Sequence, residues 1–201
     1  MKPILINLPL PIETPRLILT SPQIGDGPKL NKGIIESFGL LHKSMPWAIT
    51  KPSIEDSEEF VRKAAANWIL KECAEPWLPL FIFDKQSHDF IGATGFHNIS
   101  WQLPSVETGY WIQSKYMGNG LMIEAINAIT QYAFRQLNVK RIAITCDIDN
   151  TRSKNIPEKL GFTLEGTLKA HRIKPLGNII SDTLIYARYN LIDIPPLDVS
   201  W

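Results

Sequence analysis

Apolar and polar residues follow different periods along the chain, and the changes of period predict its strands and helices. Short runs rich in β-branched and aromatic residues, some alternating with polar residues, are typical of strands. The runs that fit this pattern are 16–20, 78–84, 90–99, 105–113, 141–148, 163–173 and 180–191. The run 141–148 is apolar almost throughout, which is typical of a strand buried on both faces.

Other apolar residues recur at helical spacing and predict helices. Segment 53–72 is the clearest, because Ser53 can cap its start with Asp56 three residues later. A helix at 22–42 is also expected, although its glycines weaken it. In 121–137 the apolar residues favour one helical face.

A short helix is expected at 150–162. Asn150 is its natural N-cap, and Gly161 is its natural C-terminal stop. Pro157 lies inside this segment and removes a helix N–H, so it should kink or shorten the helix.

The order of these elements predicts one α/β (α+β) domain over 1–201, with a mixed, mostly antiparallel central sheet of about seven strands flanked by helices. At 201 residues the chain is long enough to bury a sizeable core. No internal repeat or low-complexity linker divides it. We expect the core at about 16–189 and an extended tail at 190–201.

The composition gives no reason to expect a nucleic acid or a membrane as partner. Hydrophobic residues make up 44% of the chain and charged residues 20%, and the net charge is +1. No run of about 18 apolar residues is present. The apolar N-terminus is interrupted by prolines and is not followed by a signal-peptide cleavage pattern. We therefore expect a cytoplasmic protein.

The two cysteines, Cys73 and Cys146, have no cysteine or histidine neighbours at metal-ligand spacing. A structural zinc site is therefore not expected. Two thiols in a chain of this size are interpreted as reduced, buried residues.

Two glycines, Gly118 and Gly120, separate the strand expected at 105–113 from the helix expected at 121–137. Glycines let a ligand approach the backbone N–H groups, and a helix N-terminus favours phosphate. A dinucleotide site needs a third glycine where Ile123 stands, and a P-loop needs a lysine after its second glycine. The segment is therefore either a simple strand-to-helix turn or a site for a pyrophosphate held mainly by backbone donors.

Two segments, "KYMGNGLMIEAINAITQYAF" and "DNTRSKNIPEKLGFTLEG", together resemble the GNAT (Gcn-five-related) N-acetyltransferase superfamily. The first resembles its Q/R-x-x-G-x-G/A loop, with Lys115 where Gln or Arg is usual. The second resembles its Asn-x-x-Ser helix that runs into E-K-L-G-F. The closing segment is most similar to the RimJ/RimL-like branch, which acetylates the N-termini of ribosomal proteins. The resemblance implies splayed central strands, acetyl-CoA as cosubstrate and no metal.

The same resemblance implies which residues hold acetyl-CoA. The loop backbone would bind the pyrophosphate, the splayed strand would pair with the pantetheine amides, and the start of the short helix would contact the pantetheine arm and the thiol. The implied cofactor-binding residues are Trp111, Ile112, Met117, Gly118, Asn119, Gly120, Leu121, Met122, Asn150 and Ser153.

Acetyl transfer to an amine needs a proton acceptor, donors for the thioester oxygen and stabilisation of the leaving thiolate. Glu107 is the first candidate base, directly or through water, unless it is only an exposed strand residue. His97 is the second candidate, and it is otherwise a structural or substrate-facing residue. The N–H near Ile112 is expected to stabilise the oxyanion. Ser153 either protonates the thiolate or only caps the helix.

Some positions depart from the family pattern. A carboxylate is expected near Arg172 in the ribosomal-protein branch and is missing here, and Pro157 occupies the region where many relatives place a tyrosine. Cys146 is interpreted as a core residue. Trp47, in a proline-containing loop, is placed nearest the acceptor.

The sequence thus predicts an acetyl-CoA-dependent N-acetyltransferase whose amine attacks directly in a ternary complex, with a ribosomal-protein N-terminus as acceptor. The alternatives are a small-amine acetyltransferase acting on a polyamine, amino sugar or antibiotic, and an inactive coenzyme A-binding module. The protein is expected to be a monomer or a homodimer.

Overall fold

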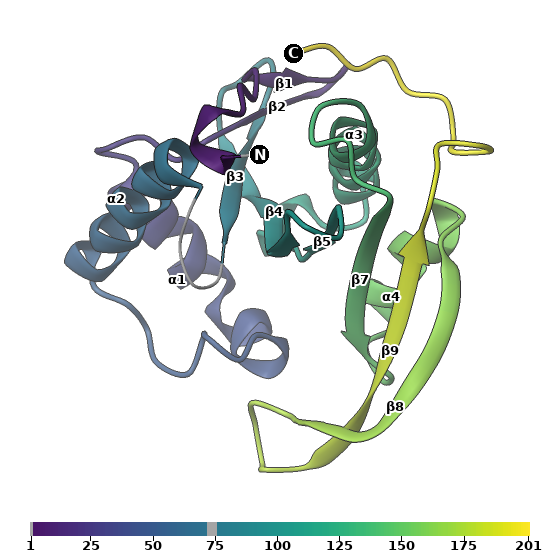
Figure 1. Ribbon diagram of the computed structural model, residues 1–201. Coiled ribbons are helices and arrows are strands. Elements are labelled where there is room, and N and C mark those ends of the chain that lie inside the picture. The colour runs from purple at the N-terminus through teal and green to yellow at the C-terminus, as the bar shows by residue number, and fades with distance from the viewer. Residues whose placement is uncertain (1, 72–75) are drawn as a thin grey trace.

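The computed structural model describes residues 2–71 and 76–201 of the chain (Figure 1). Cys73, expected to be buried and reduced, lies outside the described residues. Cys146 is a free and buried cysteine, as expected.

The elements follow one another in an order close to the predicted one. The helices are η1 (Pro3–Leu5), α1 (Gly27–Ser44), α2 (Ile54–Leu70), η2 (Ser114–Tyr116), α3 (Leu121–Arg135) and α4 (Thr151–Lys159). The strands are β1 (Ile12–Glu13), β2 (Leu17–Thr20), β3 (Leu78–Asp84), β4 (Phe90–Ser100), β5 (Ser105–Thr108), β6 (Trp111–Ile112), β7 (Arg141–Asp147), β8 (Thr163–Ile173) and β9 (Ile180–Arg188).

The strands form one mixed sheet in the order β1-β2-β3-β4-β5-β7-β9-β8, with β6 also paired to β4. Within the described residues, β5 and β7 pair in parallel and the other pairings are antiparallel. Two of the nine strands, β1 and β6, are only two residues long. The prediction of a mixed, mostly antiparallel sheet flanked by helices is confirmed.

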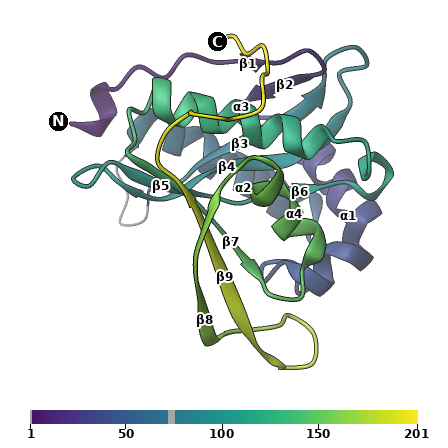
Figure 2. The ribbon, with the colours of Figure 1, turned by 90° about the vertical axis from the view of Figure 1, so that its right-hand side faces the viewer.

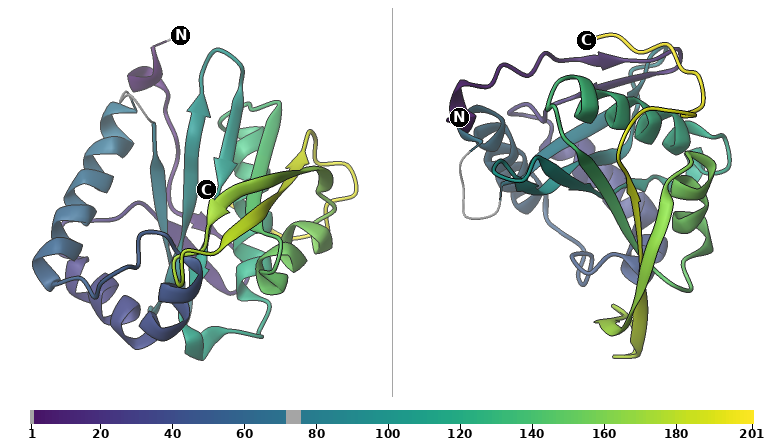
Figure 3. Two further views of the ribbon diagram at one scale, coloured as in Figure 1. Left: turned by 90° about the horizontal axis from the view of Figure 1, so that it is seen from below. Right: turned by 45° about the vertical axis from the view of Figure 1, so that its right-hand side comes forward.

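Helices cover both faces of the sheet (Figure 3). On one face α1 and α2 pack with Phe81 and Phe90. On the other face α3 and α4 pack over the remaining core, which includes the neighbouring residues Leu80 and Ile82. Successive strand residues point to opposite faces, so β3 contributes to both layers.

The capping pair predicted for α2 is present. Ser53 Oγ accepts a hydrogen bond from the Asp56 N–H at 3.0 Å, and Asp56 Oδ2 accepts one from the Ser53 N–H at 2.8 Å. Helix α1 begins at Gly27, later than the expected position 22, because the preceding residues form a turn in which the Gln23 N–H donates to Asp26.

Helix α4 continues past Pro157 and ends at Lys159. Asn150 caps its start, because Oδ1 accepts the Ser153 N–H at 3.1 Å. Gly161 has a φ of 69°, the left-handed conformation typical of a residue that follows a helix end. The cap and the stop are therefore where the sequence predicted them.

Helix α3 is buried on nearly all sides, and the expectation of a single buried face was wrong. The tail 190–201 crosses the helix on the side away from the sheet (Figure 2). Asn127 donates to the Pro195 carbonyl at 2.8 Å, and Gln131 donates to the Leu197 carbonyl at 3.3 Å. Asn127 and Gln131 can thus be buried, because the extended tail supplies partners for their side chains.

Candidate active site

Strands β5 and β7 pair for only a short distance, from Ser105–Arg141 to Glu107–Ala143. After that point the chain from β5 stays on β4 through β6, whereas β7 continues along β9 (Figure 2). We call this place, between residues 108–112 and β7, the strand divergence. Backbone groups that face it have no neighbouring strand to bond, so they are available to a ligand.

The strand expected over 105–113 is interrupted after Thr108 and resumes as β6. Side-chain hydroxyls hold the interruption to β4: Thr94 donates to the Gly109 carbonyl at 2.9 Å, and Thr108 donates to the Gly95 carbonyl at 2.8 Å. The register with β4 is the same before and after the interruption. Successive side chains therefore still alternate between the two faces of the sheet across the interruption.

Trp111 and Ile112, predicted to bind pantetheine, form β6 and are half-buried. The Gln113 N–H donates to the Ile91 carbonyl of β4 at 2.8 Å. Because N–H groups of an antiparallel pair point alternately toward and away from the partner, the Ile112 N–H points away from β4, to the strand divergence. This direction fits the predicted oxyanion donor.

The glycine loop, residues 117–122, leads from η2 into α3. Gly118 and Gly120 have φ values of 83° and 74°, which residues with a side chain adopt only with strain. Gly120 is the N-cap of α3, and within the described part of the chain no side chain caps this helix end. The first N–H groups of α3 therefore remain free for an anion. Met117, Asn119, Leu121 and Met122 also lie where they were predicted, in this loop and the first helical turn.

A buried carboxylate and an arginine brace the glycine loop, and sequence reasoning missed both. Arg16 donates to Glu124 at 2.6 Å and to the Asn119 carbonyl at 3.0 Å, and its side chain is 49% exposed. Glu124 lies in the first turn of α3, where a carboxylate is stabilised by the helix dipole. The signal in the sequence was an acidic residue, Glu124, in the first turn of a largely apolar predicted helix.

The structure brings together the two predicted base candidates. Glu107 and His97 are direct cross-strand partners, and Glu107 Oε1 lies 3.6 Å from His97 Nε2. Thr145 of β7 donates to Glu107 at 2.6 Å, and Asn98 donates to it at 2.9 Å. We call these four residues the carboxylate cluster.

Burial by itself would raise the pKa of Glu107, but contacts with His97, Thr145 and Asn98 outweigh it and lower the pKa from 4.5 to about 2. The Glu107 side chain is 19% exposed and that of His97 is 38% exposed. At neutral pH Glu107 is thus an ionised and weakly basic carboxylate at the edge of the strand divergence. It is suited to hold a cationic amine and to orient the imidazole.

On the opposite face of the sheet at the strand divergence, which we call its other side, Ser153 meets a tyrosine that sequence reasoning did not select. The Tyr110 hydroxyl donates to the Ser153 carbonyl at 2.8 Å, and the two hydroxyl oxygens lie 3.2 Å apart. Burial raises the pKa of Tyr110, so its proton is retained. Asn150 uses Oδ1 to cap α4, which leaves its amide NH2 group for a ligand.

Cys146 lies beside these hydroxyls in the core. Burial raises the pKa of its thiol above the ordinary value, although the charge of Arg172 and the neighbouring Ser153 hydroxyl act in the opposite direction. Arg172 donates to Thr183 at 2.9 Å. We call Tyr110, Ser153, Cys146 and Arg172 the hydroxyl cluster. The hydroxyl cluster contains no carboxylate, and Arg172 places a positive charge near the Cys146 thiol.

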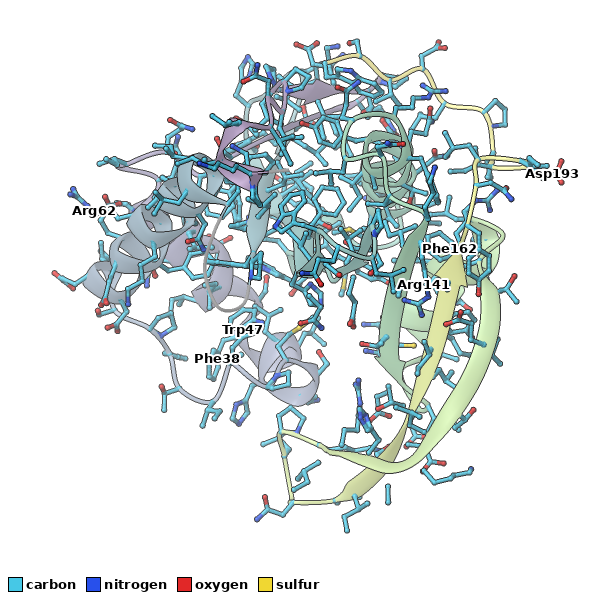
Figure 4. The ribbon with its side chains drawn as sticks, in the orientation of Figure 1. Phe38, Trp47, Arg62, Arg141, Phe162 and Asp193 are labelled. Carbon is cyan, nitrogen blue, oxygen red and sulfur yellow. The ribbon has the colours of Figure 1, made fainter. Side chains whose placement is uncertain are left out.

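Trp47 lies in the loop after α1, with its ring centroid 6.1 Å from that of Trp111 (Figure 4). The residue is 51% exposed. Trp111 packs in turn against Phe90 of the core. An exposed aromatic side chain therefore stands beside the predicted pantetheine-binding strand.

Among residues 2–71 and 76–201, no group of three or more acidic, histidine or cysteine side chains is arranged to hold a metal ion. Over the same residues, no helix has the length and apolar character needed to cross a membrane.

Residues 16–163 match the family model of the acetyltransferase (GNAT) domain. The ribosomal-protein-serine acetyltransferase of Escherichia coli (strain K12) is 28% identical over 154 residues, which are 75% of this chain and 84% of that protein.

Two solved structures resemble the chain over most of its length. The microcin C7 self-immunity acetyltransferase MccE, in complex with acetyl-CoA and AMP, is 27% identical, with a TM-score of 0.78 over 88% of this chain and 93% of that one. RimL, a ribosomal L7/L12 alpha-N-protein acetyltransferase in complex with coenzyme A, is 23% identical. Its TM-score is 0.79 over 92% of this chain and 99% of that one.

Proposed function

The chain belongs to the GNAT acetyltransferase family, and on that premise we propose that it transfers the acetyl group of acetyl-CoA to the N-terminal amine of a ribosomal protein. One observation carries the proposal: the glycine loop at the uncapped start of α3 lies next to the strand divergence. Pyrophosphate and pantetheine need these two features side by side.

In this proposal, the loop N–H groups from Met117 to Met122 bind the pyrophosphate, and Arg16 adds a positive charge beside them. The backbone of Trp111 and Ile112 pairs with the pantetheine amides. The amide of Asn150 contacts the pantetheine arm. The thioester then lies in the strand divergence, between the carboxylate cluster and the hydroxyl cluster.

The chemistry proceeds by direct attack of the amine on the thioester carbonyl. Glu107 holds the incoming ammonium group. The proton of the amine then passes to Glu107 or His97, either directly or through a water molecule. The Ile112 N–H donates to the oxygen as it gains charge. Ser153 stabilises the departing thiolate.

The weak basicity of Glu107 favours an α-amine as acceptor. An α-amino group has a pKa of about 8, whereas the pKa of a lysine or polyamine nitrogen is about 10. A carboxylate whose pKa is about 2 gives little help in deprotonating a lysine or polyamine nitrogen. Trp47 and Ile49 are exposed apolar residues in the loop after α1, and Trp47 lies beside Trp111, which also supports a macromolecular acceptor.

A second candidate acceptor is a small amine that carries an aromatic base. The likeness to MccE, solved with AMP, supports it, and so does the exposed ring of Trp47, on which a base would stack.

The test is calorimetric titration of the protein with acetyl-CoA, followed by thiol release on a panel of peptides and small amines. We expect saturable binding and turnover with peptides that carry ribosomal-protein N-termini. Turnover confined to nucleotide-bearing amines would favour the second candidate. Binding without turnover on any acceptor would indicate an inactive coenzyme A-binding module, and no binding would refute the assignment of the loop. The cytoplasmic location and a monomeric or dimeric state stay predictions.

A further inference from the structure

Pro157 leaves one carbonyl of α4 without its regular helical donor. In an α-helix each N–H donates to the carbonyl four residues earlier, and proline has no N–H. The Ser153 carbonyl therefore receives nothing from position 157, and the Tyr110 hydroxyl donates to it at 2.8 Å. A tyrosine of the sheet thus completes the hydrogen bonding of a helix.

This bond fixes the direction of a second one. Tyr110 has a single hydroxyl proton, and the Ser153 carbonyl takes it. The 3.2 Å contact between the two hydroxyl oxygens is then made with Ser153 as donor and Tyr110 as acceptor. A helix serine otherwise bonds back to a carbonyl of the preceding turn. Tyr110 therefore holds the Ser153 hydroxyl toward the strand divergence.

We propose that Tyr110 is a positioning residue for the leaving group: it donates to the carbonyl that Pro157 leaves without a helical donor, and it thereby holds the Ser153 hydroxyl. The inference rests on the proposed function. The amine nitrogen bonds to the carbonyl carbon, the carbon–sulfur bond breaks with its electron pair passing to sulfur, and the proton of the amine goes to the base. The Ser153 hydroxyl turns its proton from Tyr110 to the sulfur and stabilises the thiolate, which then takes a proton from water.

The surroundings fit this role. Tyr110 lies in residues 108–112, which diverge from β7, and Ser153 lies in α4, the helix that follows β7 in the chain. Their contact therefore spans the strand divergence. Arg172 adds a positive charge on the same side, which also favours a thiolate. Glu107 is held on the opposite face by the bond from Thr145.

The experiment compares Tyr110→Phe in the wild-type and Pro157→Ala backgrounds, with thiol release and thermal unfolding as readouts. The alanine of the second background would restore the N–H donor to the Ser153 carbonyl. We expect Tyr110→Phe to lower kcat about tenfold without changing KM for acetyl-CoA, and to lower Tm. In the Pro157→Ala background Tm should recover, but kcat should stay about tenfold below that of Pro157→Ala alone. Recovery of both would reduce Tyr110 to a structural support and overturn the proposal.

Two further variants separate positioning from stability. In a Ser153→Ala background, Tyr110→Phe should have no additional effect on kcat, and additive losses would contradict the proposal. Tyr132→Phe removes another tyrosine hydroxyl that donates to a carbonyl, that of Pro9 at 2.9 Å, and should lower Tm alone. A wild-type protein that releases no thiol would overturn the proposed function together with this inference. An active wild type with unchanged kcat in Tyr110→Phe would overturn the inference only.

Discussion

The two sides of the strand divergence are built from different chemistry. The carboxylate cluster holds an ionised acid, Glu107, whose partners on β4 and β7 lower its pKa. The hydroxyl cluster holds the neutral Tyr110 and Cys146, whose pKa values are raised by burial, together with the Ser153 hydroxyl and the cation Arg172. The difference matches the charges of the proposed acetyl transfer, in which the amine arrives as a cation and the sulfur leaves as an anion.

The two sides also differ in how they are held. Glu107 and His97 are placed by the register of adjacent strands, so their contact is set by the sheet itself. Tyr110 and Ser153 come from a strand and a helix, and a hydrogen bond to a carbonyl holds them together. We therefore expect substitutions on the first side to act mainly through charge, and those on the second side through orientation.

The largest effect is expected for the first side. Glu107→Gln should lower kcat about a hundredfold, because the ammonium loses its counter-charge and His97 loses its partner. The binding of acetyl-CoA should not change. Steady-state rates across pH test this, with Glu58→Gln as a control, because Glu58 is a hydrogen-bonded carboxylate near Gly25, away from the site. Wild-type rates at every pH would remove Glu107 from the mechanism.

The same carboxylate should leave a signature in stability. Because its pKa falls from 4.5 to about 2 on folding, Glu107 stabilises the folded protein above pH 4.5, and this contribution is lost as the pH falls toward 2. The gain should be about 2 kcal/mol after allowance for partial exposure. Denaturant unfolding should show that the difference in the free energy of unfolding between wild type and Glu107→Gln narrows as the pH falls from 4.5 to 2. A constant difference would contradict the low pKa.

A change in the glycine loop should affect both sides equally, because both act on the same bound cofactor. Gly120→Val should weaken acetyl-CoA binding about tenfold, since a β-branched side chain at φ 74° blocks the approach of phosphate to the backbone. Gly25→Val is the matched control, because Gly25 also has a positive φ and open space but lies outside the site. Both variants should lose stability, and only the first should lose affinity. Equal affinity in the two, measured by calorimetric titration, would refute the role of the loop.

The smallest effect is expected at Trp47, and it should change the binding of the acceptor without changing that of the cofactor. Trp47→Ala should raise KM for the acceptor about threefold, because an exposed aromatic contact contributes roughly 0.5–1 kcal/mol. The dissociation constant of acetyl-CoA and kcat should stay the same. Leu103→Ala, a change at an exposed apolar residue in the turn after β4, serves as the control. Equal acceptor KM values in the two variants would exclude Trp47 from the acceptor site.

Local patterns accounted for much of the fold and for one part of the site. The Ser53 and Asn150 caps, the Gly161 stop and the positive φ values of Gly118 and Gly120 all depend on residues close in sequence, so they could be predicted. Burial of α3 could not, because the tail that covers it joins the helix only in the folded chain.

The sequence by itself therefore determined most of the strands, the caps of α2 and α4, the stop after α4 and the glycine loop, because each of these is fixed by backbone conformation and hydrogen bonds within a few residues. Only the tertiary structure decided the pairing of His97 with Glu107 and of Tyr110 with Ser153, and the brace from Arg16 to Glu124. These contacts join residues 10 to 108 positions apart, and strand register and helix packing, which no local pattern encodes, bring them within hydrogen-bonding reach.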